Sequence, residues 1–417
     1  MTGGAEASPV NREPQPKRPR PGKPTSRRKP SPPPSAASRR PADQGREAGA
    51  APDAHAMAER RIRIGSPAGL LAVVPALLGF EPDNSMVVLG TDRPGTDVKV
   101  TLRYDLTGPG LAGAVAGHAA SVLIAQGIHA AVAVGYGPEH LVTPVADALR
   151  DFAPRAGITV TELLRAEGHR YWSYTCTEAA CCPPEGTPFD VTGHPAARAL
   201  MAAGGRVLAS RDELASTVAP VTGDTAELMR QATRKAEEHI ARALVRAARS
   251  RRRASVRRLI AVVGLPAVSK AIGRYRDGGS LEPREAAWLT VVLRDLRVRD
   301  DAWCRMRPEH LEAHLRLWTD LTRLARPGYV RAPASLLAFV AWQQGNGALA
   351  NVALDRALAD DPHYSMAVLL RQVIDSGAPP SLAQLPMTPE EVAASYDDLE
   401  AAAEEEEPCA HDAGSDS

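Results

Sequence analysis

Short apolar runs alternate with longer stretches of helical periodicity between residues 60 and 170. The runs that predict strands are 61–64, 85–90, 98–104, 130–136 and 158–166. Helices are predicted between them over 66–79, 111–127 and 138–152, and Ser66 and Gly79 have the residue types that begin and end the first of these. Strands that alternate with helices in this way are typical of an α/β layer. The pattern therefore predicts an α/β domain over residues 59–222, with a mixed or partly parallel sheet and helices.

The apolar positions change to a period of about 3.6 residues after Thr222, which is typical of helices. Further helices are predicted over 254–273, 283–297, 308–325, 333–344, 347–360 and 363–376. Around Gly345, small residues and the closing Pro362 have the spacing of a single tetratricopeptide-like (TPR-like) hairpin. We therefore predict an all-α helical domain over residues 223–385 that contains one such hairpin.

The two ends of the chain carry opposite charge and little apolar periodicity. Residues 1–58 hold eleven Arg and Lys against five Asp and Glu, with twelve prolines. From Glu390 onward there are eleven acids and no Arg or Lys. Such segments bury too little apolar surface to offset the entropy of ordering them. We predict a disordered basic tail over 1–58 and a mostly disordered acidic tail over 386–417.

Net charge, the length of apolar runs and the number of cysteines exclude several classes of protein. The net charge of +1 gives the whole chain no strong attraction to nucleic acid or to a membrane. No apolar run reaches the roughly 18 residues that span a bilayer, and no secretory signal is visible. Five cysteines, an odd number, argue against a disulfide scaffold. The sequence therefore predicts a cytoplasmic protein with no membrane association.

The stretch YWSYTCTEAACCPPEGTPFD, residues 171–190, lies in a cysteine-rich loop predicted over 168–190. The candidate metal ligands are His169, Cys176, Cys181 and Cys182, because imidazole and thiolate are ligands that zinc prefers. Adjacent side chains tend to diverge, so one of Cys181 and Cys182 is expected to bind, with a further ligand from elsewhere.

Two other interpretations of this loop stay open. A thiol of low pKa beside a second thiol would make it a redox or nucleophilic site. The cysteines could also be small buried side chains of a rigid structural loop. The cofactor is accordingly zinc or none.

Two other groups of residues are candidates for binding. Asp105 and Tyr136 end predicted strands, where open α/β sheets bind their ligands, and they define a candidate strand-end pocket. Residues 242–258 contain eight arginines and no acid. Within this segment the candidate phosphate-binding residues are Arg249, Arg251, Arg252 and Arg253. A solvated helix face is the alternative interpretation of these arginines.

Four stretches resemble the DUF4192 family of actinobacterial proteins, a domain of unknown function. They are GLLAVVPALLGFEPDNSMVVLG, YWSYTCTEAACCPPEGTP, VRDDAW and PASLLAFVAWQQGNGALANVALDRALADDPHYSMAVLLRQVI. The resemblance runs from about residue 60 to residue 380 and implies that the pattern W-x-S-Y-x-C…C-C-P-P-x-G is a family hallmark. The matching residues form the candidate functional loop: Trp172, Ser173, Tyr174, Cys176, Cys181, Cys182, Pro183, Pro184 and Gly186. No activity, substrate or catalytic residue comes with the family.

Three functional hypotheses follow. The first is a non-enzymatic regulatory or interaction protein whose helical domain binds a protein partner. The alternative is an enzyme or a small-molecule, metal or redox sensor that uses Cys176, Cys181 and Cys182 beside the sheet. Nucleic-acid binding through the arginine-rich helix is the weakest. The sequence does not decide whether the protein is an enzyme, and its catalytic residues are unknown.

Overall fold

The structure is a computed structural model that describes residues 66–93, 97–191, 193–202, 206–249, 256–383 and 387–406. All described residues belong to one compact unit. The predicted basic tail and the predicted strand 61–64 lie outside the described residues.

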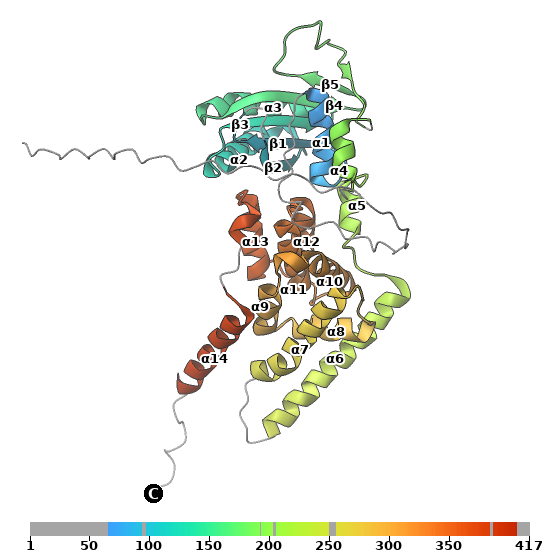
Figure 1. The fold of residues 1–417 in the computed structure, drawn as a ribbon, viewed down its shortest axis with the longest axis vertical. Helices are drawn as coiled ribbons and strands as arrows, with labels where there is room; N and C mark the ends of the chain where they lie inside the picture. The colour runs from blue at the N-terminus through green and yellow to red at the C-terminus, as the bar shows by residue number, and fades with distance from the viewer. Residues whose placement is uncertain are drawn as a thin grey trace, which may run out of the picture. The chain divides into compact units, whose positions relative to one another are not determined.

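A six-stranded mixed sheet forms the N-terminal part (Figure 1). Its strands are β1 (Ser85–Thr91), β2 (Val98–Asp105), β3 (Ala130–Tyr136), β4 (Thr159–Glu167), β5 (Arg170–Ser173) and β6 (Thr187–Pro188). They are ordered β2-β1-β3-β4-β5-β6. The β3–β4 pair is parallel, and the other described pairs are antiparallel. The prediction of a partly parallel sheet with helices is confirmed.

Helices cover both faces of this sheet because its central strand is apolar on both sides. Met86 and Val88 of β1 pack in one buried cluster with α2 (Ala112–Ala125) and α3 (Glu139–Arg155). Val87 and Leu89 point the other way and pack with α1 (Pro67–Leu78). The alternation follows from the two-residue period of a strand. β1 is buried at all seven positions, as its continuous apolar run predicts.

Helix α1 begins and ends where its capping residues predict. The Ser66 hydroxyl accepts a hydrogen bond from the Gly69 N–H at 3.1 Å, and Gly79 adopts φ 78° directly after the helix. The left-handed conformation at this position favours glycine. Pro75 lies inside the last turns, and the helix continues past it to Leu78.

Helices make up the rest of the described chain. Two short ones, α4 (Pro195–Ala202) and α5 (Arg211–Ser216), follow the sheet. The others are α6 (Gly223–Arg249), α7 (Val256–Arg276), α8 (Pro283–Val292), α9 (Leu296–Cys304), α10 (Leu311–Leu324), α11 (Arg331–Gln343), α12 (Gly347–Asp360), α13 (Ser365–Asp375) and α14 (Pro389–Glu406). The single helix predicted over 283–297 is divided into α8 and α9, because Asp295 caps a new helix by accepting from the Val298 N–H. None of the described helices is long and apolar enough to cross a membrane.

Helices α11 and α12 form the predicted hairpin. Gly345 turns the chain with φ 76°, and Asp360 at the end of α12 caps the start of α11. Its carboxylate accepts from the backbone N–H groups of Val330 and Arg331 at 3.0 Å each. The likeness of this hairpin to a tetratricopeptide repeat stays a prediction.

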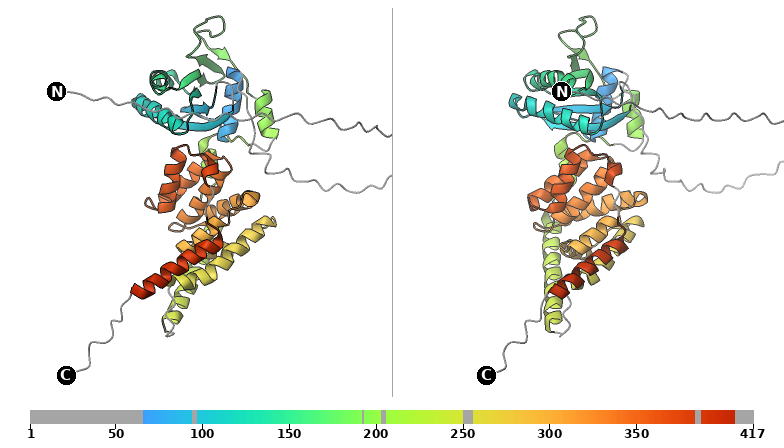
Figure 2. Two further views of the ribbon diagram at one scale, coloured as in Figure 1. Left: turned by 60° about the vertical axis from the view of Figure 1, so that its left-hand side comes forward. Right: turned by 90° about the vertical axis from the view of Figure 1, so that its left-hand side faces the viewer.

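Part of the acidic tail differs from the expectation of disorder. Residues 389–406 form α14, which packs against α9 (Figure 2). The Tyr396 hydroxyl donates to the Asp300 carboxylate at 2.6 Å, and Arg297 forms an ion pair with Asp397 at 2.7 Å. Val392 is 5% exposed. These few apolar and ionic contacts with α9 therefore stabilise a helix in a segment whose acidic composition predicts disorder.

The sheet and the helices share one core. A single buried cluster contains Val87 and Val134 of the sheet together with Trp318 and Phe339 of the helical part. The last strand ends at Pro188, and the described elements after it are helices, beginning with α4; a domain boundary at residue 222 stays a prediction. The buried side chains on the α1 side of the sheet and those of the helical part therefore belong to one continuous cluster.

Candidate functional site: a three-cysteine loop

The cysteine loop, residues 174–186, leaves and rejoins the sheet at one edge. It connects β5 to β6, and these two strands pair with each other beside β4. The sequence indicated a loop over this whole region and missed the two short strands. Because both ends of the cysteine loop are hydrogen-bonded to the sheet, its sulfur atoms are held in place from two sides.

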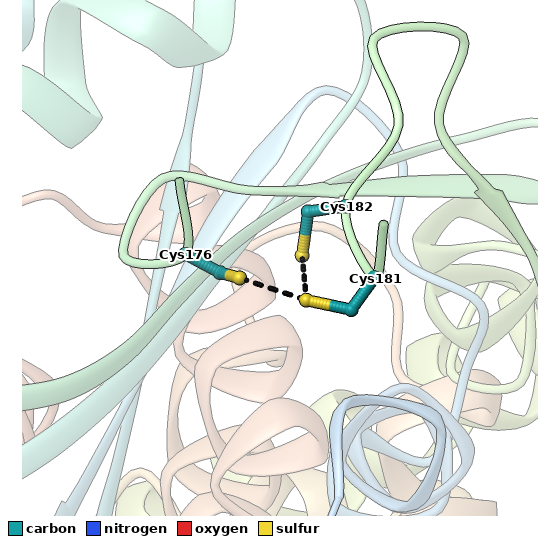
Figure 3. A group of neighbouring side chains, drawn as sticks. All are labelled: Cys176, Cys181 and Cys182. Atoms are coloured by element: carbon teal, nitrogen blue, oxygen red, sulfur yellow. Dashed lines mark hydrogen bonds between the residues drawn. The ribbon is translucent and has the colours of Figure 1, made fainter. Parts of the chain in front are cut away.

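Three sulfur atoms meet in this loop (Figure 3). The Sγ atom of Cys181 lies 3.1 Å from that of Cys176 and 3.7 Å from that of Cys182. All three lie within 4.8 Å of one another, and all three are free thiols. The expectation that only one of the adjacent pair would contribute does not hold for this arrangement.

A tight turn explains why the adjacent cysteines converge. The carbonyl oxygen of Glu178 accepts from the backbone N–H groups of Cys181 at 3.1 Å and Cys182 at 2.8 Å. The turn brings the second half of the motif back toward Cys176. Thr187 of β6 donates from its hydroxyl to the Cys181 carbonyl at 3.3 Å. Backbone geometry, rather than burial of the sulfurs, therefore sets their positions.

Ser173 holds the first half of the motif. Its hydroxyl accepts from the backbone N–H groups of Thr175 at 3.2 Å and Cys176 at 3.1 Å. The same hydroxyl donates to the carboxylate of Glu162 on β4 at 3.0 Å. Ser173 thus links the backbone of Cys176 to the neighbouring strand.

Trp172 and Gly186 fix the far side of the loop. The guanidinium of Arg165 lies 3.7 Å from the centroid of the Trp172 ring, and the indole N–H donates to the Pro184 carbonyl at 3.0 Å. Gly186 has φ 82°, and a β-carbon there would lie 2.6 Å from the indole. Any side chain at residue 186 would displace the indole, and it would also strain the left-handed backbone, which favours glycine.

Tyr174 and the proline pair complete the framework. The Tyr174 hydroxyl is hydrogen-bonded to Thr143 of α3 at 2.6 Å. The Pro183 carbonyl accepts from the Gly186 N–H at 2.9 Å, which closes the turn that contains Pro184. The residues of the hallmark other than cysteine therefore all have contacts that shape the loop.

The thiols themselves lie toward solvent. Cys181 is exposed, and Cys176 and Cys182 are partly exposed. Hydrogen bonds from the thiols of Cys181 and Cys182 lower the pKa of Cys176. The same contact with Cys176, followed by burial, raises the pKa of Cys182 to about 12, and the pKa of Cys181 is also raised, mainly through Cys176. The cluster therefore favours one thiolate, and a second or third requires a compensating cation.

His169 is not part of this group. It is exposed in the turn between β4 and β5, at the opposite end of β5 from Cys176, and its carbonyl accepts from the Phe189 N–H at 3.0 Å. The set of ligand atoms within 4.8 Å comprises Cys176, Cys181 and Cys182 alone among the residues that the structure describes. His169 therefore does not supply a fourth ligand in this arrangement.

The candidate strand-end residues, Asp105 and Tyr136, lie at the same end of the sheet, on either side of the start of β1. Ser85 of β1 pairs with Asp105 on one side and with Tyr136 on the other. Tyr136 has a buried hydroxyl with no hydrogen-bond partner in the described part of the chain, and burial raises its pKa. Asp105 is exposed and lines a cavity of about 680 Å³ that Tyr136 does not line.

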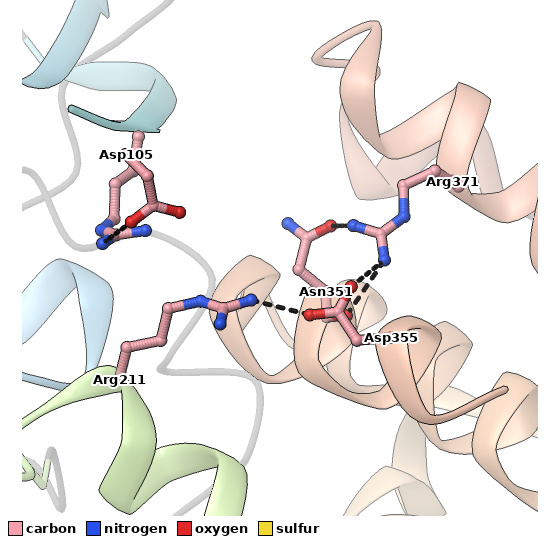
Figure 4. Close-up of polar contacts among 6 residues, drawn as sticks. Asp105, Arg211, Asn351, Asp355 and Arg371 are labelled. Carbon is pink, nitrogen blue, oxygen red and sulfur yellow. Dashed lines mark hydrogen bonds and ion pairs between the residues drawn. The ribbon is translucent and has the colours of Figure 1, made fainter. Parts of the chain in front are cut away.

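Arginines from distant parts of the chain also line this cavity (Figure 4). Arg211 of α5 and Arg371 of α13 both contact the carboxylate of Asp355, at 2.7 and 2.6 Å. Arg103 of β2 contacts Asp105 at 2.6 Å. Arg211 and Arg371 could not be identified from the sequence, because they lie 160 positions apart and meet only after folding.

The arginine-rich segment is described only in part. Arg249 is the exposed last residue of α6. Arg251, Arg252 and Arg253 lie outside the described residues. Phosphate binding by these four arginines stays a prediction.

This protein belongs to the class with a mixed sheet followed by helices, and its sheet carries an exposed loop with three thiols. The family model described as Domain of unknown function (DUF4192) matches residues 67–381, and the chain belongs to this family. The match includes the cysteine loop and excludes α14 and both tails. Neither the curated proteins nor the solved structures contain a match to this chain.

Proposed function

We propose that this protein is a regulatory protein that senses a thiophilic metal ion through Cys176, Cys181 and Cys182. The observation that carries the proposal is the convergence of three sulfur atoms within 4.8 Å on an exposed loop. Zn²⁺ is the reference ion, because thiolates are among its preferred ligands. A closed structural zinc site takes four ligands from the protein, whereas this cluster supplies three. The position left open to exchange is the reason for proposing sensing instead of a structural role.

The sulfur geometry is close to what one ion requires. Three thiolates about 2.3 Å from a tetrahedral zinc ion lie about 3.8 Å from one another. Two of the separations here are 3.1 and 3.7 Å. The first is about 0.7 Å shorter than this value, and the third pair lies within 4.8 Å. Side-chain shifts of up to about 1 Å therefore suffice for three bonds to one ion. The fourth position is left to water or to a ligand from a partner.

The positive charge of a bound ion would also offset the repulsion between the three thiols once they lose their protons. Three adjacent thiolates repel one another, which agrees with the raised pKa values of Cys181 and Cys182. A bound divalent cation removes this penalty and displaces the protons. Purely structural cysteines would be buried, whereas these three are partly or fully exposed.

A second candidate function is thiol redox sensing, supported by the 3.1 Å separation of Cys176 and Cys181. In this reaction hydrogen peroxide takes two electrons and two protons from the pair, its O–O bond breaks as the S–S bond forms, and two waters leave. The lowered pKa of Cys176 would make it the attacking thiolate. Cys182 would remain as a third thiol.

The test uses full-length protein purified without oxygen and without added metal. Zn²⁺ is titrated into it while the number of alkylated thiols is counted under native conditions. One equivalent of Zn²⁺ that protects three thiols supports the proposal. Cys176→Ser should abolish this protection, and Cys304→Ser on α9 is the matched control, since Cys304 lies outside the cluster. Thiols that react equally with and without Zn²⁺ would refute metal binding, and a peroxide-dependent loss of two thiols would then favour the redox function.

A further inference from the structure

A groove of about 840 Å³ lies between α6, α7 and α8. Its volume is within the range of about 300–1,000 Å³ that is usual for ligand sites. We call it the basic groove, and its apolar floor is formed by Ala232, Ala236, Ala267, Ala271, Trp288 and Leu289. It is independent of the cysteine loop in both sequence and position.

The packing of the helices leaves this groove open. α6 packs chiefly against α8, and α7 packs chiefly against α9 and α10, so α6 and α7 contact each other little (Figure 1). Alanines at i and i+4 face the groove from both helices, at 232 and 236 on α6 and at 267 and 271 on α7. α8 closes the bottom with Trp288. The result is an elongated depression between two long helices.

Positive charge surrounds this floor. The cationic side chains are Lys235, Arg242, Lys270, Arg274 and Arg284, and the acidic ones are Glu282 and Glu285. Glu285 is already in contact with Arg274 and with Lys270. Lys235 and Arg284 are exposed and form no ion pair within the described residues. The groove therefore has a surplus of positive charge.

Apolar surface around the groove is exposed. Leu228 of α6 lines it and is 53% exposed, and Val263 of α7, one turn before Ala267, is 39% exposed. The Trp288 indole is only partly buried, with the edge of His239 at a ring-centroid distance of 5.4 Å. Tryptophans in such positions commonly dominate binding energy at interfaces.

We propose that the basic groove binds an acidic amphipathic helix of a partner protein. Apolar side chains at i, i+4 and i+7 of that helix lie over Trp288 and the alanines, whose small size lets a helix backbone approach. Carboxylates on its flanks meet Lys235 and Arg284. The charge complementarity selects an acidic partner and speeds association. This inference does not depend on metal binding by the cysteine loop.

The test measures fluorescence anisotropy of labelled helical peptides with the full-length protein. One 18-residue peptide has leucines at i, i+4 and i+7 flanked by glutamates. A second has lysine in place of each glutamate, and a third has the acidic composition in scrambled order. The acidic amphipathic peptide should bind at least tenfold more tightly than the other two, with an affinity that falls as salt rises.

Variants locate the binding in the groove. Lys235→Glu combined with Arg284→Glu should weaken binding at least tenfold, whereas Arg150→Glu with Arg155→Glu on α3, equally exposed, should not. Ala232→Leu fills the groove and should weaken binding at all salt concentrations.

Three results would overturn the proposal. The first is equal binding of the scrambled peptide, or binding that none of the groove variants changes. The second is a concentration-dependent dimer in sedimentation that the Lys235→Glu and Arg284→Glu variant abolishes, which would assign the groove to a second copy of this chain. The third is binding of a short DNA duplex that the Lys235→Glu and Arg284→Glu variant abolishes, with no binding of the acidic peptide.

Discussion

Gly186 lies so close to Trp172 that a β-carbon on residue 186 would be 2.6 Å from Cε2 of the indole. The contact joins the two ends of the cysteine loop, since Trp172 lies in β5 and Gly186 directly precedes β6. It positions the chain that carries Cys181 and Cys182 relative to the strand that leads to Cys176. The contact with Trp172 therefore explains why the loop has a glycine at residue 186.

Gly186→Ala should disturb the loop through both the contact and the left-handed backbone, which has φ 82°. We expect a cost of about 1–3 kcal/mol for the strained backbone, together with at least tenfold weaker Zn²⁺ binding. Urea unfolding and Zn²⁺ titration measure the two effects. Gly108→Ala is the control, because a β-carbon there meets no atom within 4 Å and its φ is 168°. Equal behaviour of the two variants would contradict this role of the contact.

Ser173→Ala should loosen the cysteine loop without unfolding the protein. The variant loses the acceptor of two backbone N–H groups, which is worth about 0.5–1.5 kcal/mol per hydrogen bond. Zn²⁺ affinity should fall severalfold while the melting temperature changes little, because the loop lies at the edge of the sheet. Ser121→Ala on α2 removes a solvent-exposed hydroxyl and should change neither property. A large fall in melting temperature would mean that Ser173 supports the sheet instead.

The affinity for Zn²⁺ should rise steeply with pH. Cys182 has a pKa of about 12 and Cys181 a raised pKa, so both hold protons at neutral pH in the free protein. Binding then releases at least two protons, and the affinity should rise about 100-fold per pH unit near neutrality. Competition with a chelator of known affinity at pH 6.5 and 7.5 measures the slope. A slope near zero would show that the thiols do not bind the ion.

Without metal, the lowered pKa of Cys176 predicts that it reacts first. A thiol whose pKa is lowered is thiolate at a pH where its neighbours are still protonated, and the thiolate is the nucleophile. Limited alkylation at pH 7 followed by peptide mapping should therefore label Cys176 before Cys181, although Cys181 is the more exposed. Labelling in the order of exposure would contradict the assignment.

Asp360→Ala should destabilise the α11–α12 hairpin. Its carboxylate accepts from the N–H groups of Gly328, Val330 and Arg331, which would lose their partner. Loss of a cap of this kind costs about 0.5–2 kcal/mol. Thermal unfolding of Asp151→Ala, an exposed acid on α3, provides the comparison. Equal melting temperatures for the two variants would mean that water replaces the cap without cost.

Much of the fold could be predicted because its elements are local. The predicted strand 130–136 has the bounds of β3, and the start and end of α1 follow from Ser66 and Gly79. β5 and β6 could not be predicted, since four and two residues are too few for a period-two pattern to show. α14 escaped prediction because its stability comes from contacts of Tyr396 and Asp397 with α9.

The candidate site could be predicted as a list of residues but not as a geometry. The motif identified Cys176, Cys181 and Cys182, and their convergence depends on the turn at Glu178 and on the Trp172–Gly186 contact. His169 is close to the motif in sequence and lies at the other end of β5. The basic groove depends on which helices pack together, and no local pattern encodes that.

The most direct test of the metal site is X-ray absorption at the zinc edge on the full-length protein loaded with one equivalent of Zn²⁺. If the three cysteines bind one ion, the spectrum should show three sulfur scatterers at about 2.3 Å and one lighter ligand. Cys176→Ser should lose one of the sulfurs or all binding, and Cys304→Ser should leave the spectrum unchanged. A first shell of nitrogen and oxygen alone would contradict metal binding by the three cysteines.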